Sequence, residues 1–355
     1  MWNLVYLLWA CAGAAFPFLS RSGAFGYGRV SEFLFALSFT WVAIVGMAVM
    51  GFFVMDALSL AARLADALAG TTLGRFFAPR RCVPVTLALI VLAVSWSFFE
   101  AWNVRRVDLT LVTSKLPEGV DRLRVVHLTD IHLGGVYTTG RLARVMDIVR
   151  SAEPDILAMT GDLVDANMTG WEAEARMIAA HGAKYGAFAV PGNHEYYLGI
   201  EQALAFTKSA GLTVLRGEIA EADVGTGAGT GKIAVVGLDD PARFGRGILE
   251  PETLPEGLAL PGDRFVLLLK HRPQVIEGTA GRFDLQLSGH THGGQIWPFI
   301  HVVSRLNKSV QHLSFHGEKG ESAVYVSNGA GFWGPPLRFL TPPEVTVIDL
   351  VRGKL

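Results

Sequence analysis

The stretch that decides the fold runs from residue 123 to residue 132 and reads Leu-Arg-Val-Val-His-Leu-Thr-Asp-Ile-His. Its first part, 123–128, is a short and largely apolar run, which is typical of a buried β-strand. Asp130 and His132 follow directly. Open α/β sheets bind their ligands beyond the carboxyl ends of their strands. The stretch therefore predicts a strand that delivers polar side chains to a functional edge.

From Val104 onward the chain repeats this alternation of apolar runs and helical patterns. The β-α-β-α-β rhythm predicts a parallel sheet with short loops at its strand ends. Beyond residue 212 no long helices separate the expected strands, which predicts a mixed or antiparallel second half. The expected strands are 123–128, 156–159, 187–190, 212–215, 233–237, 265–269, 283–287, 323–326 and 345–350, and the expected helices are 138–152, 171–181 and 201–210.

Five short polar motifs stand at or just after expected strands. Each motif alone is more often a turn with a solvated polar residue than a functional site. Together they place two Asp, one Asn and five His at the carboxyl ends of the expected strands. The motifs are Asp130-Ile131-His132, Gly161-Asp162, Gly192-Asn193-His194, His271 and Gly289-His290-Thr291-His292.

The residue types in these motifs point to metal binding. Imidazole and carboxylate groups suit manganese, iron or zinc. The motifs contain no thiol, which argues against a structural zinc site. Cys11 and Cys82 both fall in apolar runs near the amino terminus, so the chain offers neither a disulfide framework nor a cysteine-based metal site in the part expected to be globular.

In order and spacing, these motifs resemble the signature of the calcineurin-like metallophosphoesterases, over residues 123–350. Residues 325–338 are similar to the membrane-anchored branch of that family. The resemblance implies an α/β fold, a four-layer α-β-β-α sandwich preceded by an all-α transmembrane region. It also implies a dinuclear metal centre and the hydrolysis of phosphate esters.

The resemblance also implies a role for each motif residue. One metal would be held by Asp130, His132, Asp162 and His292, and the second by Asp162, Asn193, His271 and His290. Asp162 would bridge the two ions. His194 would be a catalytic residue beside the substrate phosphate and not a ligand.

Elementary electrostatics agrees with these roles. Two divalent ions carry about four positive charges, and two carboxylates neutralise only two of them. The remaining charge attracts phosphate and lowers the pKa of a bridging water. The hydroxide formed in this way could attack phosphorus in line. The unperturbed pKa of histidine is near neutral, which suits His194 to protonate the leaving oxygen.

The amino-terminal region is far more apolar than the rest. Three stretches carry no charge, 2–20, 33–55 and 82–99, and each is roughly long enough to cross a ~30 Å hydrocarbon core as a helix, with spans expected at about 2–20, 33–55 and 82–101. We expect three transmembrane helices in a membrane region of residues 1–103. Residues 56–79, with Arg63, Asp66 and Arg75 among Leu and Ala, predict an interfacial amphipathic segment. Residues 104–355 would form the catalytic domain.

Two alternatives concern the first apolar run and the membrane region as a whole. The run could be a cleaved signal peptide, but its amino end has no Lys or Arg and two further apolar runs follow. The region could form a transporter, but the expected spans have no charged residue near their centres. With 31 Lys and Arg against 32 Asp and Glu, the chain lacks the basic excess of a nucleic-acid binder, so no nucleic acid is expected as a stable partner.

The leading hypothesis is therefore a membrane-anchored phosphoesterase in the cell (inner) membrane. Its substrate would be a phosphomonoester, phosphodiester or pyrophosphate, with lipid-linked compounds as natural candidates. The alternative is a membrane scaffold or binding protein with a metallophosphoesterase-like domain. Between the second and third spans lie Arg63, Arg75, Arg80 and Arg81, against Arg21 and Arg29 between the first and second. Cytoplasmic loops are enriched in Lys and Arg, so the catalytic domain is expected outside the cytoplasm.

Overall fold

The computed structural model describes residues 29–134, 139–165, 168–225, 231–244, 254–256, 258–309 and 311–353. The first expected membrane span, about 2–20, lies outside the described residues. The chain divides into two compact units. The helical unit comprises the residues up to Glu100 together with Gly334–Phe339. The sandwich unit comprises Ala101–Trp333 and Leu340–Leu355.

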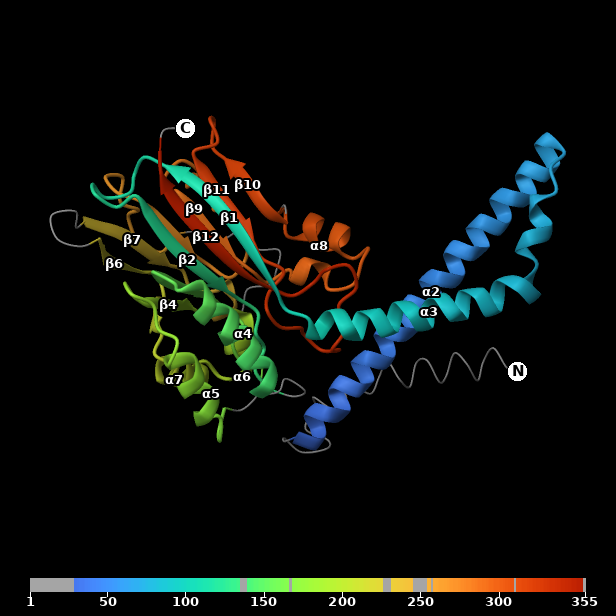
Figure 1. Cartoon of the computed structure of the whole chain (residues 1–355), viewed down its shortest axis with the longest axis horizontal. Coiled ribbons are helices and arrows are strands. Elements are labelled where there is room, and N and C mark those ends of the chain that lie inside the picture. Colours follow the sequence, from blue (N-terminus) through green and yellow to red (C-terminus); the bar gives the residue numbers. More distant parts are fainter. Residues whose placement is uncertain are drawn as a thin grey trace. The chain divides into compact units, whose positions relative to one another are not determined.

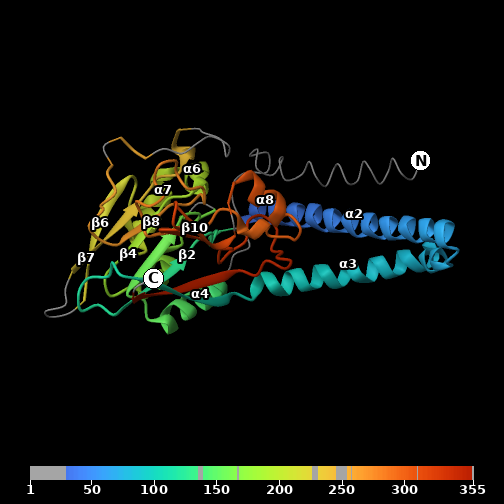
Figure 2. The same cartoon turned by 90° about the horizontal axis from the view of Figure 1, so that it is seen from above.

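The helical unit is built on α2 (Arg29–Ala69) and α3 (Pro79–Trp102), joined by the 3-10 helix η1 (Leu73–Phe77) (Figure 2). Leu34–Ala69 and Pro79–Trp102 are long and apolar enough to cross a membrane. Only 11% and 17% of their most apolar windows are buried, whereas a core helix of a soluble protein is mostly buried. Their exposed apolar surface favours contact with lipid.

α2 does not end at residue 55, where the second expected span ends. Residues 56–69 consist largely of Ala and Leu, which are strong helix formers, and contain neither Gly nor Pro. The helix stops at Gly70, whose φ of +66° suits the left-handed position that ends many helices. The Asp66 carboxylate then accepts hydrogen bonds from the backbone N–H groups of Leu73 (2.6 Å) and Gly74 (2.9 Å) and so holds the turn into η1.

Two six-stranded sheets form the sandwich unit (Figure 1). The first has the order β1-β12-β2-β3-β4-β5, in which β2 to β5 are parallel and β12 is antiparallel to β2. Its strands are β1 (Arg105–Thr113), β2 (Arg122–Leu128), β3 (Ile156–Thr160), β4 (Ala187–Val190), β5 (Thr213–Val214) and β12 (Glu344–Arg352).

The second sheet has the order β10-β11-β9-β8-β7-β6 and is mixed, as expected for the second half of the chain. Strands β7, β8, β9 and β11 are parallel, and antiparallel strands close both edges. Its strands are β6 (Glu218–Val224), β7 (Gly231–Gly237), β8 (Val266–Leu269), β9 (Leu285–Ser288), β10 (His312–His316) and β11 (Ser322–Val326).

Three apolar cores hold the layers together. One fills the space between the sheets, with Val125 and Phe188 from the first sheet and Leu267 and Tyr325 from the second. Another joins the first sheet to the helices α4 (Thr139–Ala152), α5 (Glu172–Ala179) and α7 (Ile200–Ser209). The third covers the outer face of the second sheet, largely with irregular segments between residues 254 and 283. The shorter helices are α6 (Asn193–Leu198), α8 (Ile300–Leu306), η2 (Pro241–Phe244) and η3 (His292–Gly294).

The α/β sandwich and every expected strand and helix beyond residue 120 are confirmed, with ends shifted by a few residues. The expectation did not include β1, β6 and β10. All three are edge strands. An edge strand faces solvent and carries polar side chains, as β1 does with its alternation of exposed and half-buried residues. A search for apolar runs therefore passes over it.

Candidate metal centre

The predicted site residues all follow strands that end at one edge of the sandwich. Asp130 and His132 come after β2, Asp162 after β3, and Asn193 and His194 at the start of α6 after β4. The second sheet contributes the remaining histidines, listed here with their strands: His271 after β8, and His290 and His292 after β9. Residues far apart in sequence therefore meet because neighbouring parallel strands end together.

An unusual backbone conformation marks this edge. Five of the site residues have positive φ angles between +50° and +69°, a region that non-glycine residues rarely occupy: Asp130, His132, Asp162, His290 and His292. Asp and His tolerate this conformation better than most residues. Strained backbone concentrates at functional sites, where the surrounding structure holds it in place. The chain here turns sharply so that each side chain points into the centre.

The first cluster consists of Asp130, His132 and His292. His292 Nε2 lies 3.3 Å from Asp130 Oδ1 and 3.1 Å from His132 Nε2. All three side chains are at least nine-tenths buried. Thr129 Oγ1 donates a 2.7 Å hydrogen bond to Asp130 Oδ2, which fixes the carboxylate.

The second cluster consists of Asp162, His271 and His290. His271 Nε2 lies 3.2 Å from Asp162 Oδ2 and 3.1 Å from His290 Nδ1. Asn193 joins it, since its Oδ1 is 3.1 Å from the same His271 Nε2. Asp162 Oδ2 also lies 3.7 Å from His132 Nε2 of the first cluster, so one carboxylate stands between the two groups.

These donor sets fit two metal ions. Donors bound ~2.1 Å from one ion, as in zinc–imidazole bonds, lie roughly 3.0–3.4 Å apart. Five of the donor pairs given above are 3.1 to 3.3 Å apart, whereas His132 Nε2 and Asp162 Oδ2 are 3.7 Å apart. Close approach of two imidazole nitrogens that each present a lone pair is unfavourable unless a proton or cation lies between them. The donors are carboxylate, amide and imidazole, the set suited to manganese, iron or zinc.

Backbone and carboxylate partners orient two of the imidazole rings. His271 Nδ1 lies 2.8 Å from the carbonyl oxygen of Thr160, a partner that can only accept, so Nδ1 carries the proton and Nε2 faces the cluster. His194 Nδ1 lies 2.8 Å from Asp165 Oδ1, which leaves His194 Nε2 directed toward Asp162 Oδ2 at 4.0 Å. Both rings therefore present a defined nitrogen to the centre.

Asp165 is a candidate site residue that the sequence motifs did not include. Besides binding His194, its other oxygen, Oδ2, lies 3.7 Å from His132 Nδ1. It belongs with His132 and His194 to a third group of potential ligands. The signal was present in the sequence, because Asp165 stands three residues after Asp162 in the same loop. A second carboxylate at the end of one strand is a candidate for orienting a catalytic histidine.

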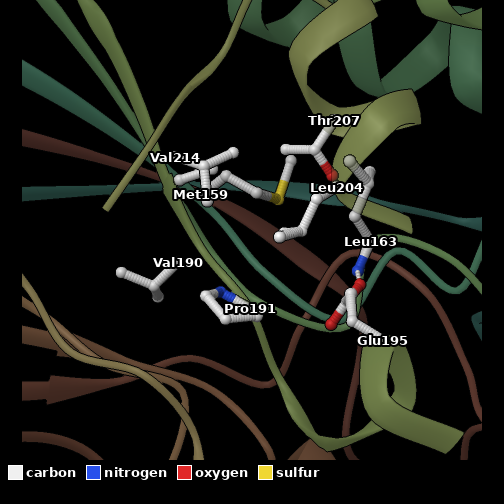
Figure 3. Close-up of a pocket in the computed structure, with 9 residues that line it drawn as sticks. Met159, Leu163, Val190, Pro191, Glu195, Leu204, Thr207 and Val214 are labelled. Atoms are coloured by element: carbon white, nitrogen blue, oxygen red, sulfur yellow. Dashed lines mark hydrogen bonds between the residues drawn. The ribbon is translucent and has the colours of Figure 1, made fainter. Parts of the chain in front are cut away.

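Glu195 lies next to His194 but points away from the metal clusters. Its carboxylate accepts hydrogen bonds from four backbone N–H groups, of Asp162 (3.0 Å), Leu163 (2.8 Å), Val164 (3.2 Å) and Gly192 (2.7 Å). Figure 3 shows it beside Leu163 and Pro191 at the wall of a small internal cavity. Glu195 thus ties the loop after β3 to the loop after β4.

Two glycines leave room for the carboxylates. A Cβ atom at Gly289 would collide with Asp130 Oδ2 and Thr129 Oγ1. A Cβ atom at Gly192 would collide with Asp162 Oδ1. Each glycine lets a loop from a neighbouring strand approach a ligand closely.

Burial and neighbouring charges shift the pKa values of side chains in the centre in both directions. Burial raises the pKa of Asp162, but the positive charge of His271 and His194 outweighs it, and the net pKa is well below the usual range. Burial lowers the pKa of His194, but the Asp162 and Asp165 carboxylates raise it more, to about 9. Burial, together with the charge of His271, lowers the pKa of His290 to about 3, so His290 stays neutral and keeps a lone pair free.

Aromatic side chains surround His194 on its open side. The ring of Tyr197 lies 5.3 Å from the His194 ring, and that of Trp333 lies 6.0 Å away. Both are partly or largely exposed. Neighbouring Tyr196 instead donates a short hydrogen bond to Asp239, which also pairs with Arg216 at 2.9 Å.

Two other polar groups near the centre have structural partners. Asp240 forms a buried two-pronged ion pair with Arg272, with N–O distances of 2.9 and 3.0 Å, and so braces the loop that carries His271. His127 is buried within β2, where its Nε2 lies 2.7 Å from Thr160 Oγ1. It is a core residue behind the site.

Comparison with known proteins gives the family. The model of the calcineurin-like phosphoesterases matches residues 123–294. An uncharacterized metallophosphoesterase of Aquifex aeolicus is 35% identical over 75% of this chain and 98% of its own length. One from Campylobacter jejuni is 35% identical over 76% of this chain and 70% of its own. A transmembrane protein with metallophosphoesterase domain from Danio rerio is 30% identical over 77% of this chain and 63% of its own length. The chain belongs to the calcineurin-like phosphoesterase family.

Proposed function

We propose that this chain is a membrane-anchored phosphoesterase that binds two divalent cations and hydrolyses a phosphomonoester, a phosphodiester or a pyrophosphate. The observation that carries the proposal is the convergence of two donor clusters on one carboxylate, Asp162. The first cation is assigned to Asp130, His132, Asp162 and His292, and the second to Asp162, Asn193, His271 and His290.

When bound, two cations of the manganese, iron or zinc type supply Lewis acidity, which lowers the pKa of water and offsets the charge of phosphoryl oxygens. The chain's own residues position the reacting groups. Asp165 holds the His194 ring through Nδ1, and the Asp162 and Asp165 carboxylates raise the pKa of that ring, which favours its protonated form. His194 therefore presents an Nε2–H group to the substrate phosphate.

The reaction exchanges one P–O bond for another. The oxygen of a water molecule forms a bond to phosphorus while the bond between phosphorus and the leaving oxygen breaks. The leaving oxygen takes the proton from His194 Nε2, and the proton lost by the water passes to solvent. Tyr197 and Trp333 flank His194 and would contact the leaving group of a substrate that His194 protonates.

Membrane anchoring rests on the two long apolar helices and on relatives named as transmembrane proteins. An anchor in the cell (inner) membrane, with several passes, keeps the site near a bilayer. Lipid phosphates and lipid-linked pyrophosphates are therefore the substrates we favour.

A metal-restoration assay on the detergent-purified full chain tests this function. The chain is stripped with a chelator, and then Mn²⁺, Zn²⁺ or Fe²⁺ is restored with an aryl phosphate, an aryl phosphodiester, pyrophosphate or phosphatidic acid as substrate. We expect hydrolysis of at least one class to return with metal. Two bound ions without hydrolysis of any class would contradict the proposal and favour the scaffold alternative.

The sidedness of the catalytic domain is a separate part of the proposal. The segment between α2 and α3 contains Arg75, and Arg80 and Arg81 open α3, so this end is placed in the cytoplasm and the sandwich unit outside. Fusions after Leu355 test it. Alkaline phosphatase is expected to be active there and green fluorescent protein dark, and the reverse pattern would place the site in the cytoplasm.

A further inference from the structure

An exposed apolar face lies beside the metal centre in the sandwich unit. Four large apolar side chains between η3 and the end of α8 are each 48% to 53% exposed, although most apolar residues of this unit are buried. We call this set the α8 face: Trp297, Phe299, Val302 and Leu306, with the exposed basic residues His301, Arg305 and Lys308 beside them. α8 lies near the edge strand β10 (Figure 1).

Helical geometry separates the α8 face into two stripes. At 100° per residue, Phe299, Val302 and Leu306 fall on one side of α8. His301 and Arg305 fall together on an adjoining side, and Lys308 follows two residues after the end of the helix. The segment from Gln295 to Ser309 contains no Asp or Glu. An apolar stripe led by a Trp and flanked by basic residues is the pattern of a helix that lies in a membrane interface.

The α8 face is next to the catalytic edge. It begins five residues after the predicted ligand His292. Gln295, two residues before it, exchanges two 3.0 Å hydrogen bonds with the backbone of Trp333, and the Trp333 ring lies 6.0 Å from the ring of His194. A surface that rests on the α8 face would therefore meet the entrance to the site.

The point where the chain enters the sandwich unit is at the same end. Trp102, the last residue of α3, packs its ring 6.1 Å from that of Phe332, and the guanidinium of Arg141 lies over both rings. Phe332 precedes Trp333, which contacts Gln295. Only residues 103 and 104 separate α3 from β1, a reach of about 7–10 Å. If α3 crosses a bilayer, the bilayer begins close to this end.

We propose that the α8 face docks the sandwich unit onto the surface of an anionic lipid bilayer, so that the phosphoesterase site opens at the membrane interface. The proposal rests on the membrane anchoring proposed above, and it deepens it by giving the catalytic unit its own lipid contact. The apolar stripe enters the boundary between headgroups and acyl chains, and Arg305 and Lys308 contact lipid phosphates. A lipid phosphate could then reach the centre without leaving the membrane.

Site-directed fluorescence on the full chain in vesicles tests the docking. Cys11 and Cys82 are replaced by Ser, and a single cysteine is introduced as Val302→Cys and labelled with bimane. Val112→Cys is the matched control, because Val112 is also an exposed valine of the sandwich unit but lies on β1, roughly 23 Å along the strand from Arg105. The vesicles contain phosphatidylcholine and phosphatidylglycerol in equal parts, with some doxyl-labelled phosphatidylcholine.

We expect the doxyl lipid to quench the probe at position 302 several-fold more strongly than the probe at position 112. Equal quenching at the two positions would overturn the proposal. Energy transfer between donor-labelled and acceptor-labelled Val302→Cys copies, without lipid quenching, would assign the α8 face to a second copy of the chain and would also overturn it.

The basic stripe gives a graded second measurement. Each of Arg305→Gln and Lys308→Gln is expected to weaken docking about fivefold, since a basic residue near an anionic surface contributes roughly this factor. Vesicles of phosphatidylcholine alone should remove the difference between these variants and the parent. Quenching requires no catalysis, so an inactive enzyme would count against the proposed function and leave the docking result to stand on its own.

Discussion

The two sheets contribute different chemistry to the same centre. The loops after the first sheet carry both carboxylates of the predicted ligand set, Asp130 and Asp162, and also the amide of Asn193. The second sheet contributes three imidazoles, from His271, His290 and His292. The first sheet thus supplies the negative charge that attracts two cations, and the second completes their coordination. Removal of a carboxylate ligand of the first sheet should therefore lower metal content and turnover more than removal of an imidazole of the second sheet.

The largest expected effect is that of Asp162→Ala. One carboxylate stands between the two clusters, so its removal is expected to empty both sites and abolish hydrolysis. Metal analysis by mass spectrometry measures this directly. Asp108→Ala, which removes an exposed carboxylate on β1, is the control and should retain two ions. Two ions still bound to Asp162→Ala would show that the bridging assignment is wrong.

Removal of an imidazole from the second sheet should have a narrower effect. His290 clusters with Asp162 and His271, whereas His292 clusters with Asp130 and His132. Each of His290→Ala and His292→Ala is therefore expected to lower the metal content from two ions to one. Turnover should fall by more than ~100-fold, since loss of an outer-shell partner alone costs ~10–100-fold.

The metal content of these two variants also tests the pairing of ligands. Spectra of the Co²⁺-substituted protein should differ between His290→Ala and His292→Ala, because each variant keeps a different site. Identical spectra, or loss of both ions from either variant, would contradict the assignment of the two histidines to separate ions.

His194→Ala should lose catalysis while it keeps metal. His194 donates its backbone N–H to Asp162 at 3.0 Å, a contact that the alanine variant retains, and its ring is assigned to no ion. A general acid contributes ~10²–10⁴-fold. The loss should be large for a substrate with a poor leaving group and small for an activated aryl phosphate, whose leaving oxygen needs no proton. Equal losses on both substrates would contradict the role of general acid.

Much of the fold and of the centre could be predicted from the sequence, because both depend on local patterns. The strand from 187 to 190 is a plain apolar run bounded by Gly and Pro, and its bounds were confirmed. The structure brings the motif residues together, since parallel neighbouring strands bring their carboxyl ends to one edge. Their assignment to two ions stays a prediction until metal is measured.

Other features could not be predicted, because they depend on partners that are distant in sequence. Glu195 stands in a motif beside His194, yet it turns inward because four N–H groups of two loops converge on its carboxylate. The exposure of Val302 and Leu306 was also hidden. An apolar run after a ligand motif predicts a packed helix. The structure shows instead that the described part of the chain leaves these two side chains about half exposed.

The smallest expected effect is that of Asp165→Asn, within the first sheet itself. Asparagine keeps the size of Asp165 and can still accept a hydrogen bond from His194 Nδ1, so both ions should remain bound. The negative charge is lost, however, and Asp165 is one of the groups that raise the pKa of His194, after Asp162. The pKa of His194 should therefore fall. Because the protonated ring is the active form, the alkaline limb of the kcat–pH profile should move to lower pH, with turnover at neutral pH reduced roughly 10–100-fold.

Loss of turnover with an unmoved alkaline limb would instead indicate that Asp165 acts through His132, whose Nδ1 lies 3.7 Å from Asp165 Oδ2. In that case the metal content should fall as well, so one sample distinguishes the two roles.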